Sequence, residues 1–189
     1  MAMLGDASAQ GYLATMYYYG LGVEKDFKEA AKWQRKAADQ GWKVAQLNLG
    51  YMYANGHGVE QDFKEAAKWN RKAADQGLAD AQHLLGVAYD DGQGVKQDFK
   101  EAVQWYRKAA DQGYAKAQHK LGVMYNNGEG VLEDNVTAYA WWNIAAANGS
   151  KSAKDNKPKI AKDMTPEQIA KAQELSKEMV KKNPKLINK

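Results

Sequence analysis

The sequence predicts an all-α protein, a right-handed α-α superhelix (solenoid) built from stacked helical hairpins. Three observations support this fold class. The heptapeptide RKAADQG occurs at residues 35–41, 71–77 and 107–113, so the chain repeats with a period of 36 residues. Within each period, apolar residues recur at spacings of three and four, which is the spacing of one helix face. Glycines separate these stretches at the places where helices should end.

The period divides most of the chain into four repeats, which are residues 5–40, 41–76, 77–112 and 113–148. In the second repeat, the first half places Ala45 and Leu49 on one helix face and ends at Gly56. The second half begins at Asp62, a residue type favoured as an N-cap, and ends at Gly77. Each repeat should therefore fold as a helical hairpin, with a helix A followed by a helix B.

A single hairpin exposes most of its apolar surface, so hairpins of this kind fold by stacking on their neighbours. Residues that recur in every repeat should therefore form the contacts between repeats. The alanines of RKAADQG would allow a close approach of helices, and the charged residues of helix B should face the solvent. One large residue in each helix B should fill the space beside the alanines; these residues are Trp33, Trp69, Trp105 and Trp141.

The chain after residue 148 departs from the repeat. Helix B of the fourth repeat has apolar residues at positions that are charged in the third, such as Ile144 in place of Lys108, so another segment should cover this face. Residues 149–182 are expected to form that cover as two capping helices, near 153–162 and 166–181. Thr165 and Gln168 would form a capping box at the start of the second helix. Residues 183–189 are polar and terminal, and we expect them to be disordered.

The composition limits the possible functions. The chain has no cysteine, which excludes disulfides, thiolate nucleophiles and cysteine-ligated metals. No segment approaches the roughly 18 consecutive apolar residues of a transmembrane helix. The segment after residue 148 has eleven lysines and five acidic residues, which gives it a charge of +6. Since the whole chain has a net charge of +4, residues 1–148 carry −2. A lysine-rich end suits solubility or a loose acidic contact, whereas nucleic-acid binding usually needs a continuous basic face, so no nucleic-acid partner is expected.

Several motifs could hold a ligand, but each has a simpler structural explanation. The GxG pattern, as at Gly56 and Gly58, follows a helix rather than a strand, which favours a helix end with a tight turn over a phosphate site. His83 and His119 occupy equivalent positions in consecutive repeats, yet helices in contact lie about 8–10 Å apart, too far for one zinc ion. His57 lies in a link and should be exposed. We therefore expect no metal, no cofactor and no catalytic residues.

The positions of helix A that vary between repeats are the better guide to function, because stacking fixes the positions that recur. The varying positions fall at spacings of three and four and so share one face. Tyrosine and asparagine on this face combine apolar area with hydrogen-bonding groups, the usual chemistry of an interface. The expected partner-binding residues are Tyr12, Thr15, Tyr19, Asn48, Tyr51, Asn55, Leu84, Val87, Asp91, Lys120 and Asn127.

The repeat resembles that of the Sel-one-like repeat (SLR) family, a relative of the tetratricopeptide repeats. The resemblance covers residues 5–148 and rests on features that coincide: Ala-Gln early in helix A, as at Ala45, Leu-Gly after it, as at Leu49, and YxxGxGV at its end, as at Tyr53. Ala14 replaces the helix A glycine in the first repeat, and the fourth lacks the charged helix B. The resemblance implies that helix A lines the concave side of the superhelix, where partners bind.

The predicted function is a non-enzymatic scaffold that binds a protein or peptide partner in this concave groove. One alternative is a hydrolase of the β-lactam or cell-wall type, because some cysteine-rich relatives have been described as acting on β-lactams. Another is a binder of anionic surfaces or nucleic acids through the lysine-rich C-terminal segment. Tyr12 and Tyr19 could also simply cover the end of the first repeat. The resemblance favours a bacterial protein, exported or periplasmic rather than cytoplasmic.

Overall fold

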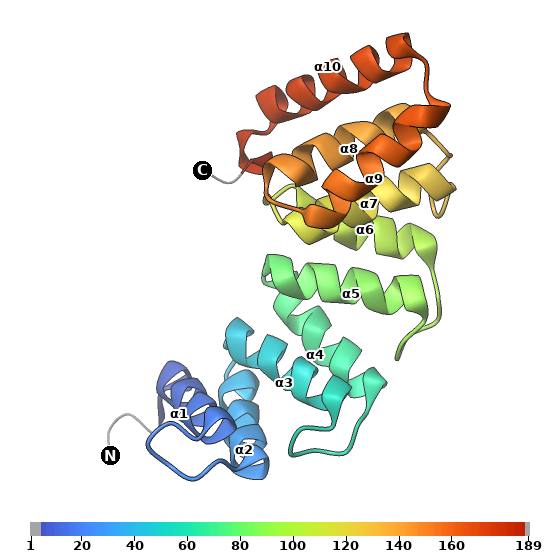
Figure 1. Cartoon of the computed structure of the whole chain (residues 1–189). Helices are drawn as coiled ribbons and strands as arrows, with labels where there is room; N and C mark the ends of the chain where they lie inside the picture. Colours follow the sequence, from blue (N-terminus) through green and yellow to red (C-terminus); the bar gives the residue numbers. More distant parts are fainter. Residues whose placement is uncertain (1–4, 188–189) are drawn as a thin grey trace. The chain divides into compact units, whose positions relative to one another are not determined.

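The computed structural model describes residues 5–187, and every regular element within them is helical (Figure 1). The fold is the all-α solenoid of helical hairpins that the sequence predicted. The contacts divide the described residues into two units, 5–97 and 98–187. The first unit contains α1 (Ala7–Tyr19), α2 (Phe27–Asp39), α3 (Lys43–Asn55), α4 (Phe63–Asp75) and α5 (Ala79–Asp91). The second contains α6 (Phe99–Ala110), α7 (Ala115–Asn127), α8 (Asn135–Ala147), α9 (Lys151–Ile160), η2 (Ala161–Asp163), α10 (Pro166–Lys182) and η3 (Pro184–Leu186).

Aspartate caps set the start of each helix B, and glycines set the end of each helix A. Each helix B begins after an aspartate whose carboxylate accepts two backbone hydrogen bonds from the first turn. In α4, Asp62 Oδ1 accepts from the N–H groups of Lys64 at 2.8 Å and Glu65 at 3.1 Å. Each helix A is followed by a glycine in the left-handed conformation, such as Gly56 with a φ of +67°. The hairpin boundaries therefore follow from residues that recur in every repeat.

Glutamines of the repeat connect neighbouring hairpins through buried hydrogen bonds. Gln46, from the Ala-Gln pair of helix A, is only 4% exposed and donates through Nε2 to the carbonyl oxygen of Ala38 in the preceding repeat. Its Oε1 accepts from Gln76 Nε2, the glutamine of the next RKAADQG, at 2.8 Å. These bonds satisfy polar groups that would otherwise be buried unpaired. The equivalent glutamine bonds to the preceding repeat join Gln82 to Ala74 and Gln118 to Ala110.

The arginine of RKAADQG also connects repeats, which corrects the prediction that the charged residues of helix B all face solvent. Arg35 donates through its guanidinium to the hydroxyl of Tyr53 in the next repeat, and the guanidinium carbon lies 5.1 Å from the centre of the Trp69 ring. The charge alternation along helix B does not reveal this contact, because the partner lies on another helix. The equivalent bonds join Arg71 to Tyr89 and Arg107 to Tyr125.

Small and large apolar residues pack together between hairpins, as the sequence predicted. In the first unit, Ala37 and Ala38 form one buried cluster with Leu49 and Trp69, and each of these four residues is at most 2% exposed. Trp33, at the equivalent position of the first repeat, is only half-buried. The large residue of helix B is therefore fully buried only where a preceding hairpin packs against it.

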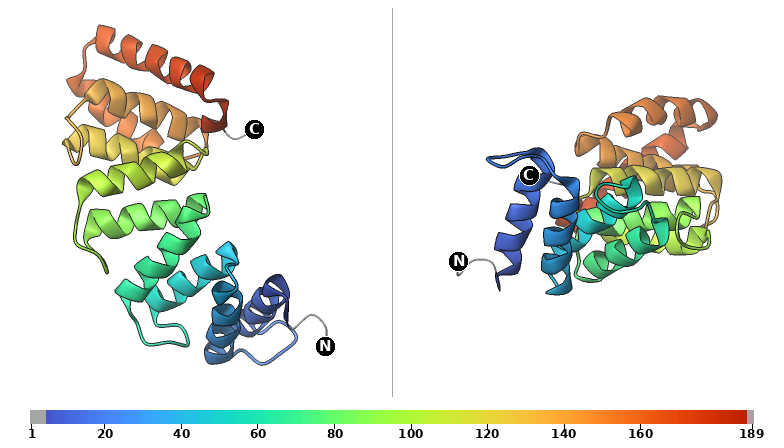
Figure 2. Two further views of the ribbon diagram at one scale, coloured as in Figure 1. Left: turned by 180° about the vertical axis from the view of Figure 1, so that it is seen from behind. Right: turned by 90° about the horizontal axis from the view of Figure 1, so that it is seen from below.

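The segment after α8 covers that helix from two directions. Figure 2 shows α9 and α10 beside α8, and both helices contact it. Val136 on α8 and Ile169 on α10 pack against the same buried apolar cluster. α9 continues the repeat register, because Ala153 stands 36 residues after Ala117 and both are fully buried. The apolar face of α8 that the sequence left without a partner thus packs against these two helices.

The structure differs from the prediction of disorder at residues 183–187. Pro184–Leu186 form η3, and Leu186 is 2% exposed. The Leu186 carbonyl oxygen accepts hydrogen bonds from Gln118 Nε2 at 2.8 Å and from Asn148 Nδ2 at 2.6 Å. Burial of one leucine and two hydrogen bonds offset the entropy lost on ordering this polar segment. Residues 188 and 189, for which disorder was also predicted, lie outside the described residues.

Candidate partner-binding surface

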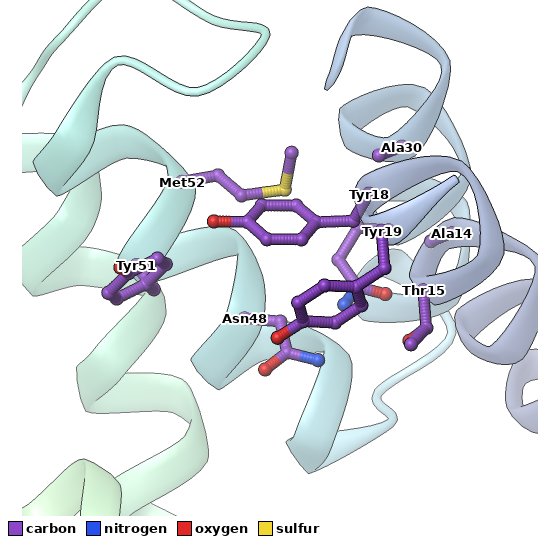
Figure 3. Close-up of a pocket in the computed structure, with 9 residues that line it drawn as sticks. Ala14, Thr15, Tyr18, Tyr19, Ala30, Asn48, Tyr51 and Met52 are labelled. Atoms are coloured by element: carbon purple, nitrogen blue, oxygen red, sulfur yellow. The ribbon is translucent and has the colours of Figure 1, made fainter. Parts of the chain in front are cut away.

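A pocket of about 150 Å³ opens between α1 and α3 in the first unit (Figure 3). Its rim is exposed, with Tyr19 66% and Tyr51 49% exposed, whereas Gln34 on α2 is 4% exposed and lies at its base. Figure 3 shows the ring of Tyr18 beside the side chain of Met52. We call this pocket the first subsite. It is lined by Ala14, Thr15, Tyr18, Tyr19, Ala30, Gln34, Asn48, Tyr51 and Met52.

A second pocket of about 230 Å³ repeats this arrangement one repeat later, between α3 and α5. Asn70 on α4 takes the place of Gln34, from which it is separated by 36 residues, and it is 7% exposed. Tyr51 lines both pockets, so they form one continuous surface of the first unit. This second subsite is lined by Tyr51, Ala54, Asn55, Phe63, Ala66, Ala67, Asn70, Leu84, Val87, Ala88 and Gln93.

The second unit has a pocket of about 430 Å³ in the same register, between α7 and α9. Trp142 on α8 takes the place of Gln34 and Asn70, and α9 stands where a further helix A would stand. This third subsite is charged, unlike the other two. It is lined by Val123, Asn126, Asn127, Glu133, Asn135, Trp142, Asn156, Lys159, Ile160 and Asp163.

Aromatic contacts hold the wall of the first subsite in place. The Tyr18 hydroxyl lies 2.8 Å from Nδ1 of His57, and the ring of Phe27 stacks on the His57 ring with centroids 4.9 Å apart. His57 is thus half-buried between repeats, not exposed in a link as predicted. Burial, together with the neighbouring Tyr51, raises the pKa of the Tyr18 hydroxyl above its ordinary value. Tyr18 therefore remains a neutral hydrogen-bonding group at physiological pH.

The two amides at the base of these subsites are not fully hydrogen-bonded. Gln34 Oε1 and Asn70 Oδ1 are both buried and have no hydrogen-bond partner among the described residues. A buried acceptor without a donor typically costs about 1–3 kcal/mol. Asn70 Oδ1 also lies against Gly50, where an added Cβ would be 2.4 Å from this oxygen. The helix A glycine of the Leu-Gly motif thus makes room for the amide.

Sequence reasoning missed Gln34 and Asn70 because it assigned helix B to stacking and to solvent. A signal was present. Polar residues occupy this buried stripe in the first two repeats, where the third and fourth have Tyr106 and Trp142. Helix B therefore also has a position that varies between repeats, as helix A does.

The structure brings most of the predicted partner-binding residues to the three subsites. Tyr12 instead packs against Trp42, with ring centroids 6.1 Å apart, and lines none of them. Asp91 is an exposed residue at the end of α5, and Lys120 lies with its Nζ 5.9 Å from the centre of the Tyr106 ring. The predicted residues that line a subsite are Thr15, Tyr19, Asn48, Tyr51, Asn55, Leu84, Val87 and Asn127.

The histidines and acidic residues form no metal centre within residues 5–187, where no three such side chains are grouped closely enough to hold an ion. His119 Nε2 lies 3.2 Å from Asn156 Nδ2, and its ring stacks on Trp142. Burial, with a smaller contribution from Lys120, lowers the pKa of His119. Across the same residues, no helix is long and apolar enough to cross a bilayer.

Comparison with known proteins identifies similar repeats and similar structures. A sequence profile of the Sel1 repeat matches residues 7–42, 43–78, 79–114 and 115–150. A protective antigen from uropathogenic Escherichia coli strains, which displays an SLR fold, is 39% identical with a TM-score of 0.88 over 98% of this chain and 40% of that chain. A Sel1 repeat protein from Oxalobacter formigenes is also 39% identical, with a TM-score of 0.77 over 79% of this chain and 62% of that chain.

A more distant structure is the cysteine-rich protein B of Helicobacter pylori, which is 25% identical with a TM-score of 0.55, over 69% of this chain and 94% of that chain. No protein with a curated description matches the sequence. The chain spans 40% and 62% of the lengths of the Escherichia coli and Oxalobacter formigenes proteins.

Proposed function

Because the chain belongs to the Sel1 repeat family, whose repeats mediate protein interactions, we propose that it is a non-enzymatic scaffold. Its partner is a protein or peptide segment that binds in the groove lined by helix A of each repeat. The observation that carries this proposal is that a pocket recurs at equivalent positions of successive repeats. The first and second subsites lie one repeat apart and share Tyr51.

The distribution of exposed apolar side chains supports the same surface. Large apolar residues scattered singly over a surface need no explanation, but a group of them on one face marks an interaction site. Tyr19 and Tyr51 are 66% and 49% exposed at the rim of the first subsite. Tyr12 and Val44, which are 68% and 37% exposed, lie on the same two helices, α1 and α3. Stacked hairpins hold these side chains in place before the partner arrives, which reduces the entropy cost of binding.

A triple variant tests the proposed groove. Tyr19→Ala, Asn48→Ala and Tyr51→Ala together remove the rim of the first subsite and one wall of the second. We expect the affinity for a partner captured from a bacterial lysate to fall at least about 100-fold, because aromatic anchors of an interface typically contribute about 2 kcal/mol or more each. Isothermal titration calorimetry with the purified partner measures the change.

A matched control tests whether the loss of any exposed apolar side chain would weaken binding. Leu132 is 90% exposed and lines none of the three subsites, so Leu132→Ala should leave the affinity unchanged. Both variants should melt within a few degrees of the parent, because exposed substitutions usually change stability by less than about 0.5 kcal/mol each. A partner that binds the triple variant as tightly as the parent would place the site elsewhere.

A further inference from the structure

We infer that the first subsite accepts a positively charged side chain, an arginine or a lysine, from an extended segment of the partner. This inference rests on the proposed function and adds to it the chemistry of the group recognised. Three independent features of the pocket support it: its aromatic rings, its unpaired acceptor and its lack of charge.

The exposed rings of the subsite, Tyr19 and Tyr51, are available to a cation, whereas the Tyr18 ring packs against other rings. The face of a tyrosine ring is electron-rich and attracts ammonium and guanidinium groups. Elsewhere the chain supplies such cations itself, for example Lys36 at 4.2 Å from the centre of the Trp33 ring and Lys72 at 3.9 Å from that of Trp69. No cation of the described residues lies over Tyr18, Tyr19 or Tyr51. Tyr19 and Tyr51 therefore lack the cation that Trp33 and Trp69 of helix B have.

The unpaired acceptor requires a donor that can reach the base of the pocket. Gln34 Oε1 is buried without a hydrogen-bond partner, and Ala30 and Met52 line the pocket together with Gln34. The terminal torsion of a glutamine is broad, so the oxygen can turn toward an incoming N–H group at little cost. Arginine and lysine combine a long apolar stem with nitrogen donors at its end. The stem would pack on the alanine and the methionine while the end donates to Gln34.

The charge of the lining favours a cation over an anion. No Lys, Arg, Asp or Glu lines the first or the second subsite. An anionic group would find no cation to pair with, only the neutral donors of the hydroxyl and amide groups, and it would face electron-rich tyrosine rings. The third subsite differs, because Glu133, Lys159 and Asp163 line it, and the inference does not extend to it.

The test uses peptides selected against the full chain. A random library of 12-residue peptides displayed on phage is selected on the purified protein, and the enriched peptides are synthesised. We expect at least one arginine or lysine in them whose replacement by the uncharged citrulline or acetyl-lysine weakens binding at least about 10-fold, as expected for a desolvated cation–ring contact with a charged hydrogen bond. Fluorescence anisotropy measures the affinities.

Gln34→Met supplies the matching change in the protein. The variant keeps the length of the side chain and removes its hydrogen-bonding group. It should weaken the parent peptide, and it should weaken the citrulline or acetyl-lysine peptide less, because a neutral N–H donor makes a weaker hydrogen bond to Gln34 than a charged one. Removal of an unsatisfied buried acceptor should also leave the melting temperature unchanged or raise it by about 2–4 °C. An unchanged affinity of the folded Gln34→Met variant for the parent peptide would contradict the inference.

The outcomes separate the inference from the proposed function. Peptides that bind the parent, lose binding to the Tyr19, Asn48 and Tyr51 triple variant, and tolerate loss of every cationic residue would overturn the inference and leave the groove intact. Peptides that bind the triple variant as well as the parent, or a selection that enriches none, would overturn both. The replacement in the peptide gives a result even if Gln34→Met does not fold.

Discussion

Gly58→Ala should destabilise the protein by about 3–5 kcal/mol, the range of mutations that disrupt packing and backbone conformation together. Gly58 has a φ of +74°, a conformation in which other residues are strained. An added Cβ would also lie 1.8 Å from the carbonyl oxygen of Phe27, at the start of α2. The loop would have to move away from the preceding hairpin to relieve this contact. Urea denaturation followed by circular dichroism measures the loss.

Gly22 provides a matched control at the equivalent position of the first repeat. Its φ is +72°, but the nearest atom to an added Cβ is Met16 Cε at 3.7 Å, an ordinary contact distance. Gly22→Ala should therefore cost only the backbone strain, about 1 kcal/mol. Equal losses at Gly22 and Gly58 would contradict a role for Gly58 in stacking. A larger loss at Gly58 would explain the GxG pattern by contact between repeats rather than by phosphate binding.

Trp69→Ala should cost about 3–5 kcal/mol, as truncation of a fully buried tryptophan typically does. Trp69 is 2% exposed and packs against Ala37, Ala38 and Leu49. Arg35 and Lys72 lie near its ring, at 5.1 Å and 3.9 Å from the ring centre, so the substitution also removes two cation–π contacts. Thermal and urea denaturation with the same probe measure the change in the free energy of unfolding.

Trp33→Ala is the matched control for this prediction. Trp33 occupies the equivalent position but is only half-buried, so less apolar surface is exposed by its removal. We expect a loss of no more than about 2 kcal/mol. If the two substitutions cost the same, the tryptophan would contribute mainly within its own helix, and the account of stacking between hairpins would be wrong.

The hairpins could be predicted because their signals are local and repeated. The aspartate N-caps, the glycine ends and the apolar spacings lie within each helix, so one repeat contains the information for its own two helices. Asp62 and Gly56 act in the structure as their residue types predict. The capping box of Thr165 and Gln168 also forms as predicted, with both reciprocal bonds present.

Contacts between distant residues could not be predicted in the same way. Arg35 looked like a solvated residue because its partner, Tyr53, lies eighteen residues away on another helix. Leu186 looked disordered because the group that binds its carbonyl, Gln118, is 68 residues away. His57 packs against Phe27 of the preceding repeat. In each case the local sequence is polar or terminal, and only the packed structure supplies the partner.

The candidate site likewise combines residues that the sequence indicated with a residue that only the packed structure revealed. Variation along helix A indicated Tyr19 and Tyr51, which line the first subsite. The base of that subsite, Gln34, comes from helix B and could be recognised only once the pocket was visible. Periodicity thus predicts the face that varies, whereas the depth and chemistry of a pocket depend on residues from three helices.

The most direct test of the proposed groove is site-specific photocrosslinking at Tyr51, which lines both the first and the second subsite. The residue is replaced by the photoreactive p-benzoylphenylalanine, and Leu132, which is 90% exposed, is replaced in a control variant. Each variant is irradiated with a partner or peptide that binds the parent. We expect a covalent adduct from position 51 and none from position 132. An adduct from position 132 alone, or equal adducts from both positions, would contradict binding in the proposed groove.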